Sequence, residues 1–327
     1  MDTGNQYSIS EFNDLSNSYT KSLFSVLHIN CRSLNRNYSE IETTLNLLEC
    51  QFKVIALTET WLNSNTLPSH MFNGYTFVGS EREHKRGGGV GLCVSNQLSF
   101  KPRQDLNFSG NICETFFIEI SKPNKNLLIG VCYRPPSQSV QEFNNILGES
   151  LSLIDRERKD CIILGDFNID LNKVDTCNSA NEFLETFVLY SYEPLIDNST
   201  RITTTSRSRI DNIFVNSTCN FSSGTIICDI SDHFPVFSFL KYSFSLKNES
   251  SYIDKRIINE ENICLFLQKL DEVDFETMFA IGRISSTDPD AVYDKFTDVV
   301  IDLYDQCFPS KKYVLNIEKK MNGLMKL

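Results

Sequence analysis

The 327-residue sequence lacks several features that would place it in common classes of protein. No apolar run approaches the roughly 20 residues of a membrane-spanning helix, and the polar N-terminus has neither the basic flank nor the apolar core of a secretory signal. No C-x-x-C pair occurs among the 11 cysteines, several of which lie inside apolar runs. We therefore expect free thiols in a reducing compartment, in a protein of the cytoplasm or nucleus that is neither secreted nor membrane-bound.

The charge balance lacks the basic excess that marks a strong nucleic-acid binder. The formal net charge is −11, and between Lys21 and Ser245 there are 24 acidic and 20 basic residues, a balance of −4. No basic stripe of the kind that gives salt-dependent affinity for DNA is visible. Composition therefore argues against a DNA-binding module, and any such function must be supported by the residues of a site.

Between residues 23 and 241, short apolar runs alternate with amphipathic helical segments. Apolar residues recur at helical spacing over 39–50, 140–154 and 179–189. Ten strand-like runs are rich in Val, Ile, Phe and Cys and are bounded by turn-forming residues. We expect an α/β fold of two β-sheets packed face to face with helices outside. The expected strands are 24–30, 53–59, 75–78, 89–95, 115–120, 127–133, 161–166, 210–215, 225–230 and 235–240.

The two ends of the chain differ from this central region. Residues 1–22 are polar and are expected to form a flexible leader. Residues 242–327 are expected to form a helical, linker-like tail, because the segment is acidic, follows a helical pattern and has no strand signals. The predicted organisation is a leader, a central domain over 23–241 and a C-terminal helical appendage that carries no recognisable chemistry.

Polar groups able to bind metal or phosphate recur where the apolar runs begin or end. In sandwich and α/β folds, strand ends bring side chains from distant segments into one cleft. Carboxylate and amide oxygens are also the ligands that Mg²⁺ prefers. These positions therefore predict a single polar site. They are Asn30, Glu59, Tyr133, Asp166, Asn168, Asp211, Asp232 and His233.

Each of these residues also has a purely structural interpretation. Asn30 fits a turn former at a strand end, and Asp166 with Asn168 fits an Asx-turn. Glu59 closes an apolar run, where a carboxylate costs desolvation unless it is paired or binds metal. His233 is either a half-buried imidazole held by the preceding aspartate or a functional imidazole whose tautomer a carboxylate fixes.

Three other features receive structural interpretations. Gly165 in the GDFN segment is expected to permit a tight turn that projects the following Asp and Asn side by side. The segment RGGGV, from Arg86 to Val90, lacks the Lys-Ser/Thr of a phosphate-binding loop and precedes a strand, so we interpret it as a β-turn. His70 and His84 lie in polar segments without ligand-spaced partners, and we expect them at the surface.

Taken in order, the motifs resemble those of the endonuclease/exonuclease/phosphatase superfamily, which includes deoxyribonuclease I and the apurinic/apyrimidinic endonucleases. Seven sequence motifs are similar to those of the endonuclease domain of non-LTR (LINE-type) retrotransposons: LHINCRSL, LTETWL, GGGVGLCV, YRPP, LGDFNIDL, SRIDNIFV and SDHFPV. This resemblance covers about residues 23–240 and implies a four-layer α/β sandwich. The segment after Ser245 resembles the linker that precedes reverse transcriptase in such elements, without the F/Y-x-D-D motif of a polymerase.

The resemblance implies how the site would hold a metal ion and a water molecule. Glu59, with Asn30 and Asp232, would hold a divalent cation, Mg²⁺ or Mn²⁺ as a substitute. Asp166 would orient or deprotonate the attacking water. Asn168 would hydrogen-bond the phosphate near that water.

It also implies how the site would hold the phosphodiester. Tyr133 and His233 would contact the scissile phosphate, and Asp211 would orient His233. Ser208 and Ser231 match positions that support substrate and site geometry. The implied enzyme is a Mg²⁺-dependent endonuclease that nicks DNA to leave a 3′-hydroxyl and a 5′-phosphate, the hydroxyl priming target-primed reverse transcription.

Two other functions are compatible with the same sequence. The same fold serves phosphatases and phosphodiesterases that act on a phospholipid, an inositol phosphate or a nucleotide, and the acidic balance fits such substrates. A catalytically idle, retrotransposon-derived remnant is the other, although all the site residues are retained. The expected partners are DNA and a reverse transcriptase domain absent from this chain, with no membrane and no small-molecule cofactor.

Overall fold

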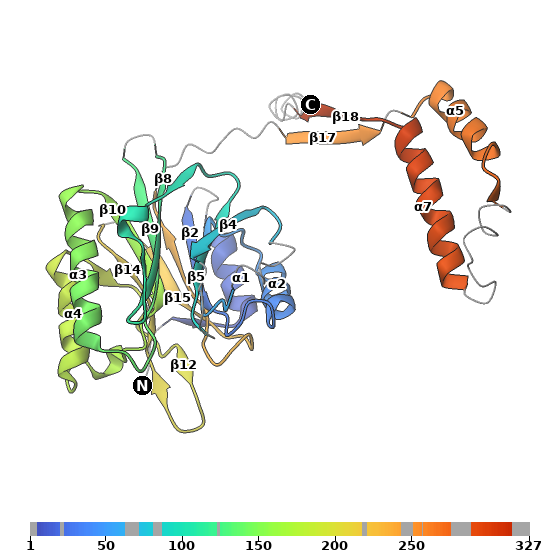
Figure 1. Cartoon of the computed structure of the whole chain (residues 1–327). Coiled ribbons are helices and arrows are strands. Elements are labelled where there is room, and N and C mark those ends of the chain that lie inside the picture. Colours follow the sequence, from blue (N-terminus) through green and yellow to red (C-terminus); the bar gives the residue numbers. More distant parts are fainter. Residues whose placement is uncertain are drawn as a thin grey trace. The chain divides into compact units, whose positions relative to one another are not determined.

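The computed structural model describes nine segments of the chain, which form two compact units, Met1–Lys247 and Asn248–Leu327 (Figure 1). The described segments are 5–19, 23–62, 72–80, 87–122, 125–217, 221–242, 251–256, 258–275 and 289–315.

The first sheet of the larger unit has seven strands in the order β1-β15-β16-β2-β3-β5-β4. It is a mixed sheet, because β2 pairs with β3 in parallel and with β16 in antiparallel orientation. The strands are β1 (Gln6–Tyr7), β2 (Phe24–Asn30), β3 (Val54–Thr58), β4 (Tyr75–Ser80), β5 (Val90–Ser95), β15 (Phe221–Ile226) and β16 (Val236–Leu240).

The second sheet is also mixed, in the order β11-β14-β10-β9-β8-β6, with β7 paired to β8. Strands β9 and β10 run in parallel, and β10 pairs with β14 in antiparallel orientation. The strands are β6 (Phe100–Pro102), β7 (Phe108–Ser109), β8 (Glu114–Ile120), β9 (Leu127–Tyr133), β10 (Asp160–Asp166), β11 (Glu193–Pro194) and β14 (Asp211–Val215). A short hairpin of β12 (Arg201–Ile202) and β13 (Arg207–Ser208) follows β11.

Helices cover the outer face of each sheet. Helices α1 (Ile9–Ser18) and α2 (Tyr38–Leu47) pack on the first sheet, and α3 (Val140–Arg156) and α4 (Asn178–Leu189) pack on the second (Figure 1). A third apolar core lies between the sheets and draws on the strands of both. This arrangement is a four-layer α/β sandwich, so the fold expected from the sequence is confirmed.

The alternation of side chains along each strand explains why the strands read as continuous apolar runs. In β2, Phe24 and Val26 face the core between the sheets, whereas Leu27 and Ile29 face the helices. Both faces are buried, so neither set is polar. The next inward positions after Val26 are His28 and Asn30, and the polar site begins there.

The expected flexible leader is wrong for the residues that the structure describes before Leu23. Gln6–Tyr7 forms β1, which pairs in parallel with β15. Helix α1 follows, with a capping box between Ser8 and Glu11, and Phe12 is fully buried against the first sheet. The mostly polar composition of this segment did not predict α1, because Phe12 is the one residue of the helix that is fully buried.

The second unit contains α5 (Glu260–Asp271) and α7 (Pro289–Cys307). It also contains an antiparallel pair of strands, β17 (Ser251–Arg256) and β18 (Ser310–Leu315), which corrects the expectation of a tail without strands. Both strands are short and rich in charged residues. More than fifty residues separate them in the sequence, so a local sequence pattern does not predict their pairing. None of the described helices is long and apolar enough to cross a membrane.

Candidate active site

One end of the second sheet carries a row of polar side chains on its inner face. The register of the strands places Asp166 beside both Tyr133 of β9 and Asp211 of β14, and Glu114 of β8 beside Tyr133. Residues directly opposite each other on neighbouring strands point to the same face. Tyr133 belongs to the core between the sheets, so the whole row points towards the first sheet. All four side chains are buried.

The first sheet contributes the facing side of the site. Asn30 ends β2, with His28 two positions earlier on the same inner face and Thr58 opposite Asn30 on β3. The Nε2 atom of His28 lies 3.0 Å from the Thr58 hydroxyl oxygen. Strands of both sheets therefore end at one place, where polar groups replace the apolar core.

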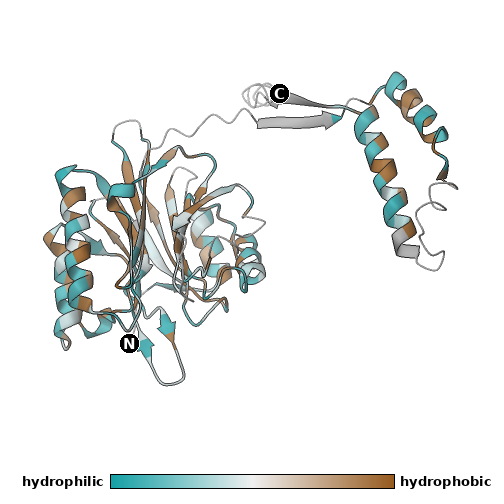
Figure 2. Ribbon diagram, viewed as in Figure 1, coloured by the Kyte–Doolittle hydropathy of each residue, from teal (hydrophilic) through white to brown (hydrophobic). Residues whose placement is uncertain are grey.

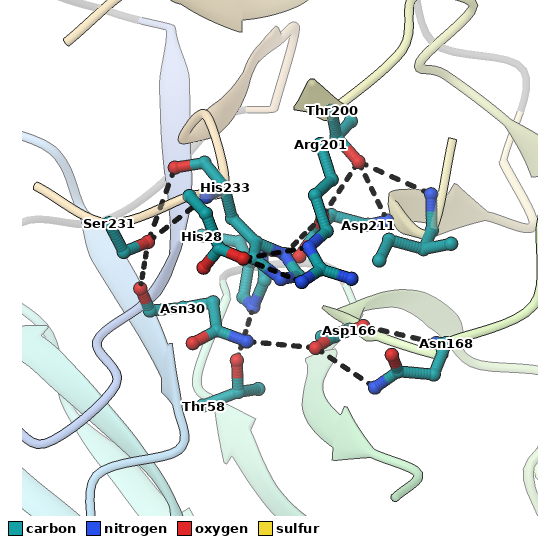
Figure 3. A network of polar contacts seen from close by, with 12 residues as sticks. His28, Asn30, Thr58, Asp166, Asn168, Thr200, Arg201, Asp211, Ser231 and His233 are labelled. Carbon is teal, nitrogen blue, oxygen red and sulfur yellow. Dashed lines mark hydrogen bonds and ion pairs between the residues drawn. The ribbon is translucent and has the colours of Figure 1, made fainter. Parts of the chain in front are cut away.

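The Asp166 carboxylate is held by three N–H donors. Its Oδ1 accepts from the backbone N–H of Asn168 at 3.0 Å, and its Oδ2 accepts from Asn168 Nδ2 at 3.1 Å. Asn30 Nδ2 donates to the same Oδ2 at 2.8 Å (Figure 3) and to Glu59 Oε1 at 3.1 Å. Asn30 thus bridges the carboxylates of Asp166 and Glu59, which come from different sheets.

The Asp211 carboxylate holds the imidazole of His233. Asp211 Oδ2 lies 2.8 Å from His233 Nδ1 and accepts a hydrogen bond from the Thr200 hydroxyl at 2.7 Å (Figure 3). The loop that carries His233 is fixed by Ser231, whose hydroxyl donates to the Asn30 carbonyl at 2.9 Å and accepts from the His233 N–H at 3.2 Å. The imidazole is therefore oriented by a carboxylate of the second sheet and anchored to β2 of the first.

Burial shifts the pKa of two of these groups strongly. Burial, with the nearby charge of Asp211, raises the pKa of Asp166 to about 8. Burial lowers the pKa of His28 to about 4, against the attraction of Asp211. His28 is therefore neutral near pH 7, and Asp166 titrates in a range suited to exchanging protons with water.

The contact between Asp211 and His233 opposes the effect of burial on the pKa of the imidazole. Burial alone would favour a neutral imidazole, but the charge of Asp211 and its hydrogen bond raise the pKa of His233 to about 9. The charge of His233 and this hydrogen bond lower the pKa of Asp211, although its burial acts in the opposite direction. The pair is thus an ionic carboxylate and imidazolium at neutral pH.

The donor set fits a divalent cation. Asp166, Asp211 and His233 each offer one ligand atom, and these atoms all lie within 4.8 Å of one another. Two carboxylates beside an amide and the carboxylate of Glu59 form an oxygen-rich set of the kind that hard cations prefer. Burial, together with the charges of Asp211 and Glu59, raises the pKa of Asp166, and a bound cation would stabilise the ionised carboxylate.

The Asp232 carboxylate contacts two arginines and not the residues of this cluster. Its Oδ1 is 2.7 Å from Arg32 Nη1, and its Oδ2 accepts from Arg201 Nε at 2.8 Å. These two arginines hold the pKa of the Asp232 carboxyl low against its partial burial. The structure therefore brings Asn30 and Glu59 to Asp166 and ties Asp232, the third residue expected at the metal, to two guanidinium groups.

Two other expected residues adjoin the network. Tyr133 is 6% exposed and lies beside Asp166 in the register of β9 and β10. Ser208 is connected through its backbone, because its carbonyl accepts from the N–H of Thr200 at 2.9 Å. Ser208 thus supports the segment whose hydroxyl binds Asp211.

Sequence reasoning missed three residues that shape the site. His28 precedes Asn30 by two positions, and the two-residue period of a strand would have placed both on one face. Arg134 follows Tyr133, is 2% exposed, and donates to the carbonyls of Phe167 at 2.8 Å and Asn168 at 2.7 Å, which fixes the loop after Asp166. Thr200 had no signal in the sequence, because a tertiary contact alone brings it to Asp211.

The backbone around the site adopts left-handed conformations at residues other than glycine. Glu59 has φ 50°, Trp61 has φ 54° and Asn168 has φ 49°. Such conformations cost roughly 1 kcal/mol or more each and gather at functional sites. They turn the chain immediately after β3 and β10, where the expected metal and water ligands stand.

The role expected for Gly165 is corrected. A Cβ atom at Gly165 would lie 1.9 Å from the carbonyl oxygen of Cys132, so glycine is required for close approach of β9 and β10, and Asn168 makes the turn. In the RGGGV segment, the described residues Gly87–Gly89 all have positive φ and lead into β5. Arg86, His70 and His84 lie outside the described residues.

Comparison with known proteins gave matches to a family and to solved structures. A model described as the endonuclease/exonuclease/phosphatase family matches residues 27–233. An AP endonuclease from Leishmania major is 15% identical, with a TM-score of 0.56 over 69% of this chain and 90% of that one. The 3′ phosphatase NExo from Neisseria, bound to a product DNA hairpin, is 14% identical, with a TM-score of 0.51 over 67% of this chain and 100% of that one.

The endonuclease domain of TRAS1, a telomere-specific non-LTR retrotransposon, is 15% identical, with a TM-score of 0.49 over 67% of this chain and 98% of that one. A search of curated proteins found no match. At these identities, the similarity of the Leishmania and Neisseria structures shows a shared fold alone.

Proposed function

The chain belongs to the endonuclease/exonuclease/phosphatase family, a family of phosphate-ester hydrolases, and we propose that it is a Mg²⁺-dependent endonuclease that nicks DNA. One observation carries this proposal. Asp166, Asp211 and His233, from distant parts of the chain, place their ligand atoms within 4.8 Å of one another at the end of the core between the sheets. A cleaved strand would carry a 3′-hydroxyl and a 5′-phosphate.

We assign the cation to the oxygen ligands of the site. Asp166 and Asp211, with Glu59 and Asn30 beside them, would hold Mg²⁺, or Mn²⁺ in its place. His233 has a raised pKa and is a protonated hydrogen-bond donor, so it is a poorer ligand than the carboxylates. When bound, the cation supplies Lewis acidity and neutralises charge on the phosphoryl oxygens.

Asp166 is the proposed general base for the attacking water. Three N–H donors fix the orientation of its carboxylate, and Oδ1, which accepts only one of them, keeps a lone pair for the attacking water. A general base acts best when its pKa lies near the working pH, and the pKa of Asp166 is raised to about 8. Asn168, whose side chain adjoins this carboxylate, would bind the phosphate near the water.

His233 is the proposed donor to the phosphate. Its Nδ1 is occupied by Asp211, which leaves Nε2 to donate a hydrogen bond to a phosphoryl or leaving oxygen. Tyr133, beside Asp166, would supply a phenol to the same phosphate. Arg32 and Arg201, both partly exposed next to Asp232, would bring positive charge to the mouth of the site.

The test uses the full chain on supercoiled plasmid with Mg²⁺. We expect open circles from the wild type and from Asp175→Asn, an exposed acid that serves as the matched control. We expect none with EDTA, and rates lower by at least about 100-fold in Asp166→Asn and His233→Gln. Nicking that persists in both site variants would overturn the assignment, and nicks that a DNA polymerase cannot extend would overturn the proposed 3′-hydroxyl.

The same preparation separates the alternative functions. Faster turnover of inositol phosphates, phospholipids or nucleotide esters than of DNA would favour the phosphatase interpretation. Binding to DNA in EDTA without cleavage in Mg²⁺ would favour an idle remnant. In the retrotransposon setting that the motifs resemble, a reverse transcriptase domain would use the 3′-hydroxyl as primer, inside the cell in the cytoplasm or nucleus.

A further inference from the structure

Helices α5 and α7 of the second unit contact each other, yet seven of their large apolar side chains stay at least 37% exposed. Phe266 of α5 lies against Tyr304 of α7 and against Phe308 at ring-centroid distances of 6.2 and 5.4 Å, and Lys269 of α5 donates to Gln306 of α7 at 2.9 Å. No residue of α5 is buried. The apolar side chains left exposed are Ile263, Leu265 and Leu267 on α5, and Tyr293, Phe296, Ile301 and Tyr304 on α7.

The distribution of these residues around α5 indicates a missing partner. Residues 263–267 read ICLFL, five consecutive apolar positions that cover a full turn of the helix. Phe266 faces α7, whereas Leu267 is 57% exposed, and Figure 2 shows hydrophobic residues recurring along both helices. The apolar residues of this turn face more directions than α7 covers, and apolar helix faces are normally buried, so α5 and α7 together present an uncovered apolar surface.

The charge on these helices identifies the kind of partner. Asp294, Asp298 and Asp302 follow one another at four-residue spacing along one side of α7. Like charges at this spacing oppose helix formation by a few tenths of a kcal/mol per pair. Together α5 and α7 carry eight acidic residues and two lysines, a balance of −6 within a chain of −11. An apolar surface bordered by carboxylates is complementary to an apolar surface bordered by basic side chains.

Other occupants fit this surface less well. A second copy of the chain would bring two acidic surfaces together, and the repulsion would oppose burial of the apolar residues. Anionic membranes and nucleic acids would be repelled in the same way. We propose that the apolar surface of α5 and α7 docks a basic amphipathic helix of a partner protein, one whose leucine-like stripe is flanked by lysine or arginine.

The experiment uses the full chain and a fluorescent amphipathic peptide, about five helical turns long, with leucine on one face and lysine flanking it. We expect roughly micromolar binding, strongest at low salt. Two double variants should each bind at least about tenfold more weakly, a loss of roughly 1.4 kcal/mol: Asp298→Lys with Asp302→Lys, and Leu267→Gln with Ile301→Gln. The matched control is Asp175→Lys with Glu182→Lys, two exposed acids of the larger unit.

The controls make the proposal refutable. A peptide with glutamate in place of every lysine must bind at least tenfold more weakly than the basic one, and hydrogen exchange must show new protection of 260–271 and 289–307 on binding. Equal binding of the two peptides, or unchanged binding in both double variants, would overturn the proposal. Strong protection of both helices in the free chain, or a dimer in sedimentation that competes with the peptide, would overturn it as well. Circular dichroism establishes that each variant is folded.

Discussion

The Nδ1 atom of His28 and the Oδ1 atom of Asp211 face each other at 3.8 Å across the two sheets. Both atoms are buried, and neither has a hydrogen-bond partner among the residues that the structure describes. The other oxygen of Asp211 is bound by His233. Asp211 therefore stands between two imidazoles, and His28, which is neutral, limits the orientations that the carboxylate can take.

We predict that His28→Asn lowers turnover by about 10- to 100-fold, the range typical of residues that orient a catalytic group, with little change in KM. The reason is that His28 contacts Thr58 and also Asp211, the carboxylate that orients His233. The ¹⁵N chemical shifts of the His233 ring should also differ between this variant and the wild type. Ser238→Ala, another buried polar residue of the first sheet, is the control. Wild-type turnover with unchanged His233 shifts would show that His28 has no positioning role.

Divalent cations should raise the Tm of the wild type, because an ion that binds only the folded state stabilises it by about 2.7 kcal/mol at 100 times its Kd. Asp166→Asn and Asp211→Asn should abolish the shift by removing central ligands. Asp232→Asn should retain it, because Asp232 is held by Arg32 and Arg201. Differential scanning fluorimetry with Mg²⁺ and Mn²⁺ measures these shifts. Loss of the shift in Asp232→Asn would instead place that carboxylate on the metal.

Stability should depend on pH through Glu119, a buried residue near the end of β8 opposite to Glu114. Burial opposes ionisation, but hydrogen bonds and charges from Asn126 and Lys159 outweigh it and lower the pKa to about 2. A folded-state pKa below the unfolded value stabilises the protein above about pH 4.5, and this contribution of roughly 3 kcal/mol is lost as pH falls towards 2. Glu119→Gln should therefore be less stable at neutral pH and lose less stability on acidification.

Urea unfolding at several pH values tests this for Glu119. The exposed residue Glu182 supplies the control, and Glu182→Gln should follow the wild type. Parallel curves for wild type and Glu119→Gln would contradict the assignment of the acid transition to this carboxyl.

Two glycine-to-alanine variants should have opposite effects on stability. At Gly165 a Cβ atom would meet the Cys132 carbonyl oxygen at 1.9 Å, so Gly165→Ala should cost about 3 kcal/mol or more by forcing two paired strands apart. At Gly148 in α3 nothing lies within 4 Å, so Gly148→Ala should stabilise by about 0.5–1 kcal/mol through helix propensity. Chemical denaturation measures both changes, and a neutral Gly165→Ala would refute the close approach of β9 and β10.

The elements predicted best from the sequence are those buried on both faces. Strands 24–30 and 127–133 have the expected bounds, because a strand between two packed layers is apolar at every position. Several strands that escaped prediction, such as Gln6–Tyr7 and Arg207–Ser208, are two residues long and therefore too short to leave a periodic signal. The longer pair, Ser251–Arg256 with Ser310–Leu315, depends on partners far apart in the sequence.

The site divides in a similar way. Residues that end apolar runs could be listed from the sequence, and the structure places Asn30, Asp166, Asp211 and His233 in one network. Their roles stay predictions. The pairing of Asp232 with arginines could not be read from the chain, because Arg32 is two hundred positions away. Tertiary contacts of this kind decide which carboxylates are free for a metal.

The origin of the site residues in two separate sheets has a consequence for the life of the molecule. His28, Asn30 and Thr58 belong to one sheet, and Tyr133, Asp166 and Asp211 to the other. A newly made or damaged chain whose sheets have not yet packed together holds only half of the reacting groups. Under the proposed function such a chain could not cleave an ester, so activity would be confined to molecules that have finished folding.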